Sequence, residues 1–285
     1  MAIERVAFLG MGIMGSRMAV NLGRGGFDVV IWNRPRERAE ELTAEHGFEV
    51  ADSPAGAASK AQATITMVVD GPHVEDVLGQ ATPGMDEGHL AIDMSTIPVS
   101  TAEALAKRLA DKGIAFLDAP VTGSAPRAAD GTLTIMAGGS EQDFERARPL
   151  FEAMGETILL VGPAGHGQAV KLLNNTVAAI NAAALAEAFT AAEARGVDLD
   201  SLMEVMRSGS GGSTMLELKG GPMAEHDFRP LFKLAHMLKD VRHTIRESGV
   251  PLTLAETAEK LYSEADAAGH GEDDFAAVIT ATERQ

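Results

Sequence analysis

The chain starts with a short apolar strand, a glycine-rich turn, a helix and a second apolar strand, and this order restricts its fold more than any other feature. Residues 5–9 and 28–32 predict the two strands. A Gly-x-Gly-x-x-Gly pattern between them allows a tight turn, close approach of the backbone to a pyrophosphate and close helix–strand packing. The helix N-terminus then faces the phosphates. We therefore expect a dinucleotide to bind at Gly10, Met11, Gly12, Ile13, Met14 and Gly15.

The end of the second strand predicts which dinucleotide binds. Sites for NAD usually place Asp or Glu there, to bind the ribose 2′-hydroxyl. This chain has Asn33-Arg34-Pro35-Arg36 instead. A guanidinium can bind a 2′-phosphate in a bidentate manner, whereas a carboxylate would repel it. We expect NADP(H) to be preferred over NAD(H), with Arg34 as the main contact and Asn33 and Arg36 assisting; the alternative is that the arginines only decorate a helix start.

Strand and helix patterns alternate up to residue 161, and strand patterns are absent after it. Alternation of this kind predicts a doubly wound α/β sheet of the Rossmann type. The segment Gly162-Pro-Ala-Gly165 marks a boundary, so we expect a dinucleotide-binding domain at 1–162 and an all-helical substrate and dimerisation domain at 163–285. No proline occurs between Ala164 and Gly221, and a helix over 168–195 would be about 40 Å long. We interpret it as a beam joining the two domains.

Three polar residues stand at the start of that long helix. Lys171 and Asn175 are four residues apart, hence on one face, and Asn174 lies close beside it. A solvated first turn is the ordinary explanation. The alternative is chemical, because a lysine held there could protonate a substrate oxygen.

Hydroxyl groups follow two of the predicted strands. Ser95 and Thr96 come after the strand at 90–93, at the strand end where open α/β sheets bind ligands. They could contact nicotinamide or substrate, or one could be a helix N-cap. Thr122 and Gly123 follow the strand at 114–118 and offer an O–H and backbone N–H groups, which suit a substrate carboxylate; a capping turn is the alternative.

Composition excludes several classes of function. A net charge of −17 argues against nucleic acid and anionic membranes as partners. The chain has no cysteine, which excludes disulfides and thiolate chemistry, and its eight histidines lack the spacing of metal ligands. No signal peptide and no apolar run of transmembrane length is evident. We expect a cytoplasmic protein without a metal.

Four separated stretches together resemble the β-hydroxyacid dehydrogenases, a family that includes 3-hydroxyisobutyrate dehydrogenase, tartronate semialdehyde reductase and glyoxylate/succinic semialdehyde reductase. They are residues 10–15, Asp118-Ala-Pro-Val-Thr-Gly123, Gly167-x-x-x-Lys171-x-x-Asn174-Asn175 and Lys239-Asp240. The similarity runs over nearly the whole chain. It implies a Rossmann domain, a helical second domain, and reversible hydride transfer between a nicotinamide and a small hydroxy acid.

The resemblance also implies roles for single residues. Lys171 is the general acid and base, Asn175 orients the lysine or the substrate, and Thr122 and Gly123 hold the substrate carboxylate. The remaining expected substrate contacts are Asn174, Phe232 and Lys239, and Lys239 is also expected to reach the cofactor.

Two departures from the family pattern bear on the substrate. Thr122 replaces the usual serine, and its methyl group crowds the site. Residues 124–127 (Ser-Ala-Pro-Arg) replace a glycine-rich continuation. The second departure, together with Trp32-Asn33-Arg34, is closer to the glyoxylate/succinic semialdehyde reductases, which favours an NADPH-dependent reductase acting on a small anionic carbonyl compound.

Other functions stay open at this point. One is an NAD-dependent 3-hydroxyisobutyrate dehydrogenase. Another is an imine reductase, although that family normally replaces the lysine with Asp or Tyr, and a third is a non-catalytic NADP-binding module. The long apolar helix predicts a homodimer or homotetramer, because two domains alone would not cover it.

Overall fold

The structure is a computed structural model that describes residues 3–284. It divides into two compact units, between Lys171 and Leu172, inside the long helix α8 (His166–Glu193). The boundary expected from the sequence lies at 162/163, nine residues earlier in the chain. Each unit has its own core, and the two are described separately.

The first unit is a nine-stranded sheet in the order β3-β2-β1-β4-β5-β6-β8-β7, with β9 also paired to β8. β1 to β6 pair in parallel, whereas β8 runs antiparallel to β6 and β7. The strands are β1 (Arg5–Leu9), β2 (Asp28–Trp32), β3 (Glu49–Val50), β4 (Ala63–Thr66), β5 (Leu90–Asp93), β6 (Ala115–Asp118), β7 (Val121–Thr122), β8 (Leu133–Gly138) and β9 (Gly155–Gly162).

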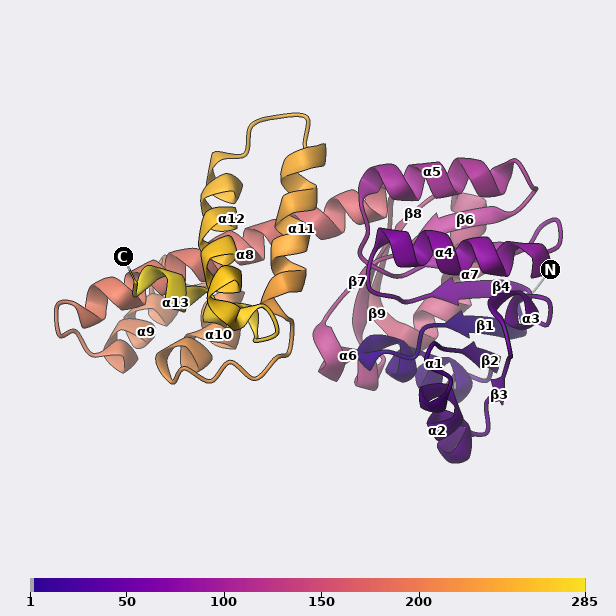
Figure 1. The fold of residues 1–285 in the computed structure, drawn as a ribbon, viewed down its shortest axis with the longest axis horizontal. Helices are drawn as coiled ribbons and strands as arrows, with labels where there is room; N and C mark the ends of the chain where they lie inside the picture. The colour runs from indigo at the N-terminus through magenta and orange to yellow at the C-terminus, as the bar shows by residue number, and fades with distance from the viewer. Residues whose placement is uncertain (1–2, 285) are drawn as a thin grey trace. The chain divides into compact units, whose positions relative to one another are not determined.

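Helices cover both faces of this sheet (Figure 1). One apolar cluster packs the sheet against α1, α2, α6 and α7, and another packs it against α3, α4 and α5. β1 contributes to both, because successive side chains of a strand point to opposite faces: Phe8 to the first and Leu9 to the second. The helices are α1 (Ile13–Arg24), α2 (Glu37–His46), α3 (Pro54–Ala58), α4 (Gly71–Ala81), α5 (Val99–Ala110), α6 (Ser124–Asp130) and α7 (Glu141–Met154).

Side chains that accept hydrogen bonds define where several of these helices begin. Asp70 accepts from the N–H of His73 at the start of α4, and Ser140 accepts from Asp143 at the start of α7. Such caps satisfy backbone donors that have no partner within the helix. α5, by contrast, has Pro98 at its N-cap position, so neither Ser95 nor Thr96 is the N-cap residue, which was one of the two alternatives for them.

The second unit is all-helical, as expected. Its core joins α8 to the helices that follow, around the fully buried Phe189 and Tyr262. These helices are α9 (Leu199–Ser208), α10 (Thr214–Ala224), α11 (Leu234–Glu247), α12 (Thr253–Ala265) and α13 (Ile279–Thr282), with a π turn at Asp266–His270 and a 3-10 turn at Phe275–Val278. The predicted fold class, a Rossmann-type unit followed by a helical unit with a long helix, is confirmed.

The expectation that the chain has no apolar run of transmembrane length is not met by α8. Within residues 3–284, α8 is long and apolar enough to cross a membrane by length and composition, with a mean hydropathy of 1.2 over its most apolar window. Half of that window is buried (50%). Core helices of globular proteins pass the same test, so this similarity is weak support for a membrane span.

Candidate functional site

The glycine turn after β1 has the geometry of a phosphate cradle. Gly10 has φ +110°, and a Cβ there would lie 2.3 Å from the carbonyl oxygen of Met67. A Cβ at Gly15 would lie 2.0 Å from the oxygen of Gly10, so α1 packs tightly on the turn. At Gly12 a Cβ would meet no atom within 4 Å, and no side chain caps α1. Gly12 therefore borders open space at a helix N-terminus, where a pyrophosphate fits.

The polar residues after β2 already have protein partners. Asn33 Oδ1 accepts a hydrogen bond from the N–H of Met11 at 2.7 Å, and its Nδ2 donates to the carbonyl oxygen of Pro35 at 2.6 Å. Asn33 thus joins the end of β2 to the glycine turn. This bonding gives it a role in shaping the turn, which the sequence did not predict.

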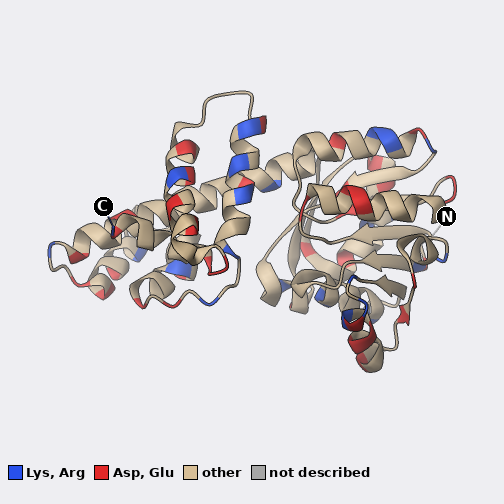
Figure 2. Cartoon of the chain, viewed as in Figure 1, with Lys and Arg blue, Asp and Glu red and all other residues tan. Residues whose placement is uncertain are grey.

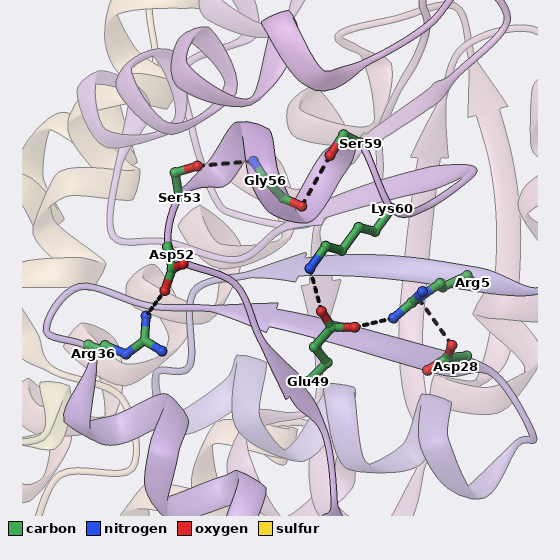
Figure 3. Close-up of polar contacts among 9 residues, drawn as sticks. All are labelled: Arg5, Asp28, Arg36, Glu49, Asp52, Ser53, Gly56, Ser59 and Lys60. Atoms are coloured by element: carbon green, nitrogen blue, oxygen red, sulfur yellow. Dashed lines mark hydrogen bonds and ion pairs between the residues drawn. The ribbon is translucent and has the colours of Figure 1, made fainter.

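The two arginines differ in how firmly they are held. Arg36 donates to Glu40 at 2.7 Å and to Asp52 at 2.6 Å, the second pair being visible in Figure 3. Both bonds raise the pKa of Arg36. Arg34 has one looser ion pair, 3.6 Å to Asp76, and is exposed. Of the two guanidiniums, Arg34 is the more available for a phosphate.

The loop after β5 carries Ser95 and Thr96. Ser95 is fully buried, its hydroxyl accepts the N–H of Val68 at 2.9 Å, and its carbonyl accepts from Nε2 of Gln168 at 2.8 Å. Its side chain therefore joins the ends of β4 and β5. Thr96 is half-buried in the same loop. Because β1, β2, β4, β5 and β6 are parallel, this loop and the glycine turn lie at one edge of the sheet.

Asp118, at the end of β6, binds the first turn of α8. Its Oδ1 accepts the N–H of Gly165 at 2.7 Å, and its Oδ2 accepts that of Gln168 at 2.8 Å. The side chain is fully buried, and burial raises the pKa of this carboxyl to about 7, against the opposing effect of the two backbone hydrogen bonds. Asp118 opens the stretch that resembles a substrate loop, yet its contacts are with the helix.

Lys171 lies on α8 three residues after Gln168, and only 7% of it is exposed. Gln168 is fully buried, and both ends of its amide bind the β5–α5 loop: Nε2 donates to Ser95, and Oε1 accepts the N–H of Ile97 at 3.0 Å. The lysine therefore follows a helical turn that is bonded to the ends of β5 and β6. A solvated first turn, the ordinary explanation, is wrong for Lys171.

Thr122 and Gly123 lie beyond β6. Residues 118, 121 and 122 pair with β8 in one antiparallel register, so β7 continues the line of β6 after an interruption at Ala119-Pro120. Gly123 has φ +136°, and a Cβ there would be 2.8 Å from the Cβ of Arg127. A glycine is needed at this position for α6 to start, so Gly123 also has a local structural role.

In the second unit, Asn175 and Lys239 share a partner. Asn175 is buried, and its Nδ2 donates to Oδ2 of Asp240 at 2.8 Å. Nζ of Lys239 lies 3.4 Å from Oδ1 of the same carboxylate. Asn174 is exposed, with its Nδ2 3.4 Å from Oδ1 of Asn175. Asp240, which the sequence singled out only as the neighbour of Lys239, connects α8 to α11.

Phe232 lies in the non-helical segment 228–233, directly before α11, although these residues continue the helical pattern of that helix. Oδ2 of Asp274 accepts the N–H groups of Leu231 and Phe232 at 3.0 and 3.1 Å. Oδ1 binds Nζ of the buried Lys219 at 2.7 Å. The Phe232 ring is 6.2 Å from that of Phe275, edge-on. A buried ion pair thus fixes the backbone that carries Phe232.

Positive charge gathers on α11 in an otherwise acidic chain (Figure 2). A hollow of about 260 Å³ is lined by Lys239, Arg242, His243 and Arg246, together with Asp266, Ala235 and Leu238. Burial lowers the pKa of His243, and Lys239 lowers it further. Arg242 is paired with Glu259 at 2.8 Å. Lysine and arginine therefore supply the cationic character of this face, which suits an anionic ligand.

Within residues 3–284, no group of three or more His, Asp or Glu residues is arranged to hold a metal ion. The first unit brings the glycine turn, Ser95, Thr96 and Lys171 to one edge of its sheet. The sequence did not predict roles for Asp118, Gln168, Asp240 or Asp274. Asp118, Gln168 and Asp240 lie within the motif stretches, and this position in the sequence could have drawn attention to them. Asp274 lies outside these stretches.

Comparison with known proteins covers both units. A family model for the NAD binding domain of 6-phosphogluconate dehydrogenase matches residues 5–162. A second, described as NAD-binding of NADP-dependent 3-hydroxyisobutyrate dehydrogenase, matches residues 165–282. The chain is 34% identical over 282 residues to glyoxylate/succinic semialdehyde reductase 1 of Arabidopsis thaliana, covering 97% of each chain.

Solved structures are similar to this chain over nearly its whole length. A 3-hydroxyisobutyrate dehydrogenase of Mycobacterium tuberculosis, solved with L-serine, superposes with a TM-score of 0.90 at 35% identity, over 98% of this chain and 99% of that one. The protein Psf3, in complex with NADP⁺ and 2-OPP, gives a TM-score of 0.86 at 25% identity, over 96% of this chain and 99% of that one.

Proposed function

The chain belongs to the β-hydroxyacid dehydrogenase family, and from this membership we propose that it transfers a hydride between NADP(H) and a small hydroxy acid, semialdehyde or 2-oxo acid, with Lys171 as general acid and base. The observation that carries the proposal is the position of Lys171. It is a buried lysine on a helical turn bonded to the ends of β5 and β6, the sheet edge that also bears the glycine turn.

The residues present fit a nicotinamide dinucleotide. Gly12 offers an open helix N-terminus for the pyrophosphate, and Arg34 offers a guanidinium for a 2′-phosphate. No acidic residue directly follows β2 in the sequence, the position from which NAD sites usually bind the ribose 2′-hydroxyl, and this supports NADP(H) over NAD(H). Met11, Ile13, Met14, Ser95 and Thr96 complete the proposed cofactor contacts.

When bound, the cofactor supplies or accepts the hydride at its nicotinamide ring. In the reductive direction, Nζ of Lys171 gives its proton to the carbonyl oxygen as that oxygen gains negative charge, and the hydroxy acid forms. In the oxidative direction, the same nitrogen, deprotonated, takes the hydroxyl proton. Thr122 and Gly123 are proposed to bind the substrate carboxylate through the hydroxyl and a backbone N–H.

Substrate binding is further proposed for Asn174, Asn175, Phe232 and Lys239. The hydrogen bond from Asn175 to Asp240 gives its amide one orientation, and its Oδ1 accepts a longer hydrogen bond, 3.4 Å, from Nδ2 of Asn174. The positive face of α11 supports an anionic substrate, since the net charge of −17 would otherwise repel it. Among the family's substrates we favour glyoxylate or succinic semialdehyde, on the sequence of residues 32–34 and 124–127. An NAD-dependent 3-hydroxyisobutyrate dehydrogenase is the alternative.

We further infer a cytoplasmic homodimer or homotetramer, in which residues 163–285 supply the subunit interface. α8 exposes Val170, Leu173 and Val177, three apolar residues at helical spacing, with 38%, 53% and 57% of their surface accessible. Exposed apolar rows of this kind mark interaction surfaces. Light scattering should give at least twice the mass of one chain, and Leu173→Lys with Val177→Lys should lower it; a monomer in the unaltered protein would contradict this.

The experiment that tests the proposed activity is a substrate panel. Oxidation of NADPH and NADH is followed with glyoxylate, succinic semialdehyde, tartronate semialdehyde and methylmalonate semialdehyde, and with a cyclic imine as the rival substrate. We expect NADPH to be consumed with at least one of the four acids and not with the imine. Turnover of the imine alone would indicate an imine reductase, and binding of NADPH without turnover of any compound would indicate a binding module.

A further inference from the structure

Two buried side chains hold the first turn of α8, and the proposed reaction gives neither of them a task. Asp118 accepts hydrogen bonds from the N–H groups of Gly165 and Gln168, so the helix is tied to the end of β6. Gln168 is tied through its side chain to Ser95 and Ile97, beyond β5. All of these groups belong to the first unit, and both Asp118 and Gln168 are fully buried.

Close packing leaves the same turn no room to shift. A Cβ at Gly167 would lie 2.4 Å from the carbonyl oxygen of Met136 and 2.7 Å from that of Asp118. A Cβ at Gly138, on β8, would lie 2.6 Å from Oδ1 of Asp118. The backbone of α8 therefore rests directly on β6 and β8, with the Asp118 carboxylate between them.

The anchored turn determines the position of Lys171. An α-helix repeats every 3.6 residues and rises about 5.4 Å per turn, so Lys171 stands one turn beyond Gln168 on nearly the same face. Rotation or translation of the anchored turn therefore moves the Cα atom of Lys171 by a similar amount. A displacement of about 1 Å between reacting groups can lower a rate about 100-fold.

We propose that Asp118 and Gln168 are positioning residues for Lys171: by bonding the first turn of α8 to the ends of β5 and β6, they set where the lysine ammonium stands at that edge of the sheet. The inference rests on the proposed role of Lys171 as the proton donor. It assigns to Asp118, the first residue of a substrate-loop stretch, a task that involves no contact with substrate.

The main test replaces Gln168 with methionine, which has a similar length and neither donates nor accepts these hydrogen bonds. We expect kcat with the preferred acid to fall about 10–100-fold, while its KM and the Kd of NADPH change less than about threefold. The matched control is Asn21→Leu. Asn21 is another buried amide of the first unit, and it bonds the carbonyl oxygen of Ala128 at 2.7 Å, away from α8. It should lower Tm without lowering kcat.

A double-mutant comparison separates positioning from general loss of structure. If Gln168 acts through the lysine, Gln168→Met should lower the residual rate of Lys171→Met by less than about twofold. An equal loss of rate with and without the lysine would overturn the proposal.

Hydrogen exchange supplies a readout that does not depend on activity. Asp118→Asn keeps the shape of the side chain and turns one acceptor into a donor. In this variant and in Gln168→Met, amides within residues 165–171 should exchange faster than in the unaltered protein, and in Asn21→Leu they should not. Unchanged exchange, or an unchanged kcat in Gln168→Met, would overturn the proposal. If the unaltered protein turned over no member of the panel, the proposed function would fail instead, and the exchange result would still report on the anchor.

Discussion

The side-chain amide of Asn175 donates a 2.8 Å hydrogen bond to Oδ2 of Asp240, and this bond joins α8 to α11 inside the second unit. Both residues are buried, with 6% and 1% of their surfaces exposed. A buried amide with a single strong acceptor has one favoured orientation, so Asp240 determines which way Asn175 faces.

Replacement of Asp240 by alanine should therefore affect both stability and activity. The buried amide of Asn175 would lose its acceptor, which destabilises a protein by about 1–3 kcal/mol. Urea unfolding measures this, and kcat/KM should fall because Asn175 is no longer oriented. Asp266→Ala, at an exposed carboxylate of the same unit, should change stability by less than about 0.5 kcal/mol. Equal changes in the free energy of unfolding for Asp240→Ala and Asp266→Ala would show that the hydrogen bond between Asn175 and Asp240 does not stabilise the fold.

Cofactor preference should depend on Arg34 more than on Arg36. Arg34→Asp should reduce the ratio of kcat/KM for NADPH to that for NADH by roughly 10-fold or more, since a carboxylate repels a 2′-phosphate. Arg36→Ala should reduce it less, because Glu40 and Asp52 already hold that side chain. An unchanged ratio in Arg34→Asp would contradict the assignment.

Asp52 offers the converse test. Asp52→Asn removes one of the two carboxylates that bind Arg36, so the guanidinium should become more available and the NADPH preference should rise. Glu49→Gln is the matched control, because Glu49, on β3, pairs with Arg5 of β1 and with Lys60 after α3, and not with Arg36 (Figure 3). A rise in the preference with Glu49→Gln as well would point to general charge and not to Arg36.

Asp118 should make stability depend on pH in a specific direction. Its pKa in the folded state, about 7, lies above its ordinary value of 3.8. The folded protein therefore holds a proton that the unfolded chain releases, and the contribution is complete below about pH 4 and is lost as the pH rises through about 7. Asp118→Asn does not titrate. Its free energy of unfolding relative to the unaltered protein should rise by about 4 kcal/mol between pH 4 and 8, at 1.36 kcal/mol per pKa unit, and a difference independent of pH would refute this.

The fold could be predicted from the sequence because its signals are local. Glycine spacing, the alternation of strand and helix patterns, and the absence of proline between residues 164 and 221 all act over short stretches of chain. The segment before α11 shows where this fails: residues 228–233 have a helical pattern, but the buried carboxylate of Asp274 accepts two of their N–H groups, and the segment is not helical.

The candidate site was predictable only in part, for the same reason. Its motif residues could be named, whereas the bonds that hold them could not. Asp118 meets Gly165 and Gln168 across 47 and 50 residues of sequence, and Asn175 meets Asp240 across 65. No local pattern reports such pairs. The sequence also could not show that Arg36 is engaged by Asp52, 16 residues away.

The buried pair of Lys219 and Asp274 should be the most sensitive point of the second unit. Lys219→Met leaves a buried carboxylate without its cation, which typically destabilises a protein by about 3–5 kcal/mol. Asp274→Ala should be worse, because three backbone N–H groups lose their acceptor as well. Thermal unfolding gives the ranking, and Lys233→Met, at an exposed ion pair with Glu272, should have little effect.

Lys171 is the residue on which the proposed chemistry depends. Its removal takes away the only group to which a proton-transfer role is assigned, and general acid catalysis is typically worth about 10²–10⁴-fold. Lys171→Arg separates charge from proton transfer, because a guanidinium keeps the positive charge but does not give up its proton near neutral pH. Lys171→Met and Lys171→Arg should both retain NADPH binding, since the glycine turn and Arg34 are unaltered.

The most direct measurement is the single-turnover rate of NADPH oxidation by stopped flow, with saturating substrate, in Lys171→Met and Lys171→Arg. We predict that both variants bind NADPH within about twofold of the unaltered protein and transfer hydride at least 100-fold more slowly. A rate within a few-fold of the unaltered protein, in either variant, would contradict the role of Lys171 as the proton donor.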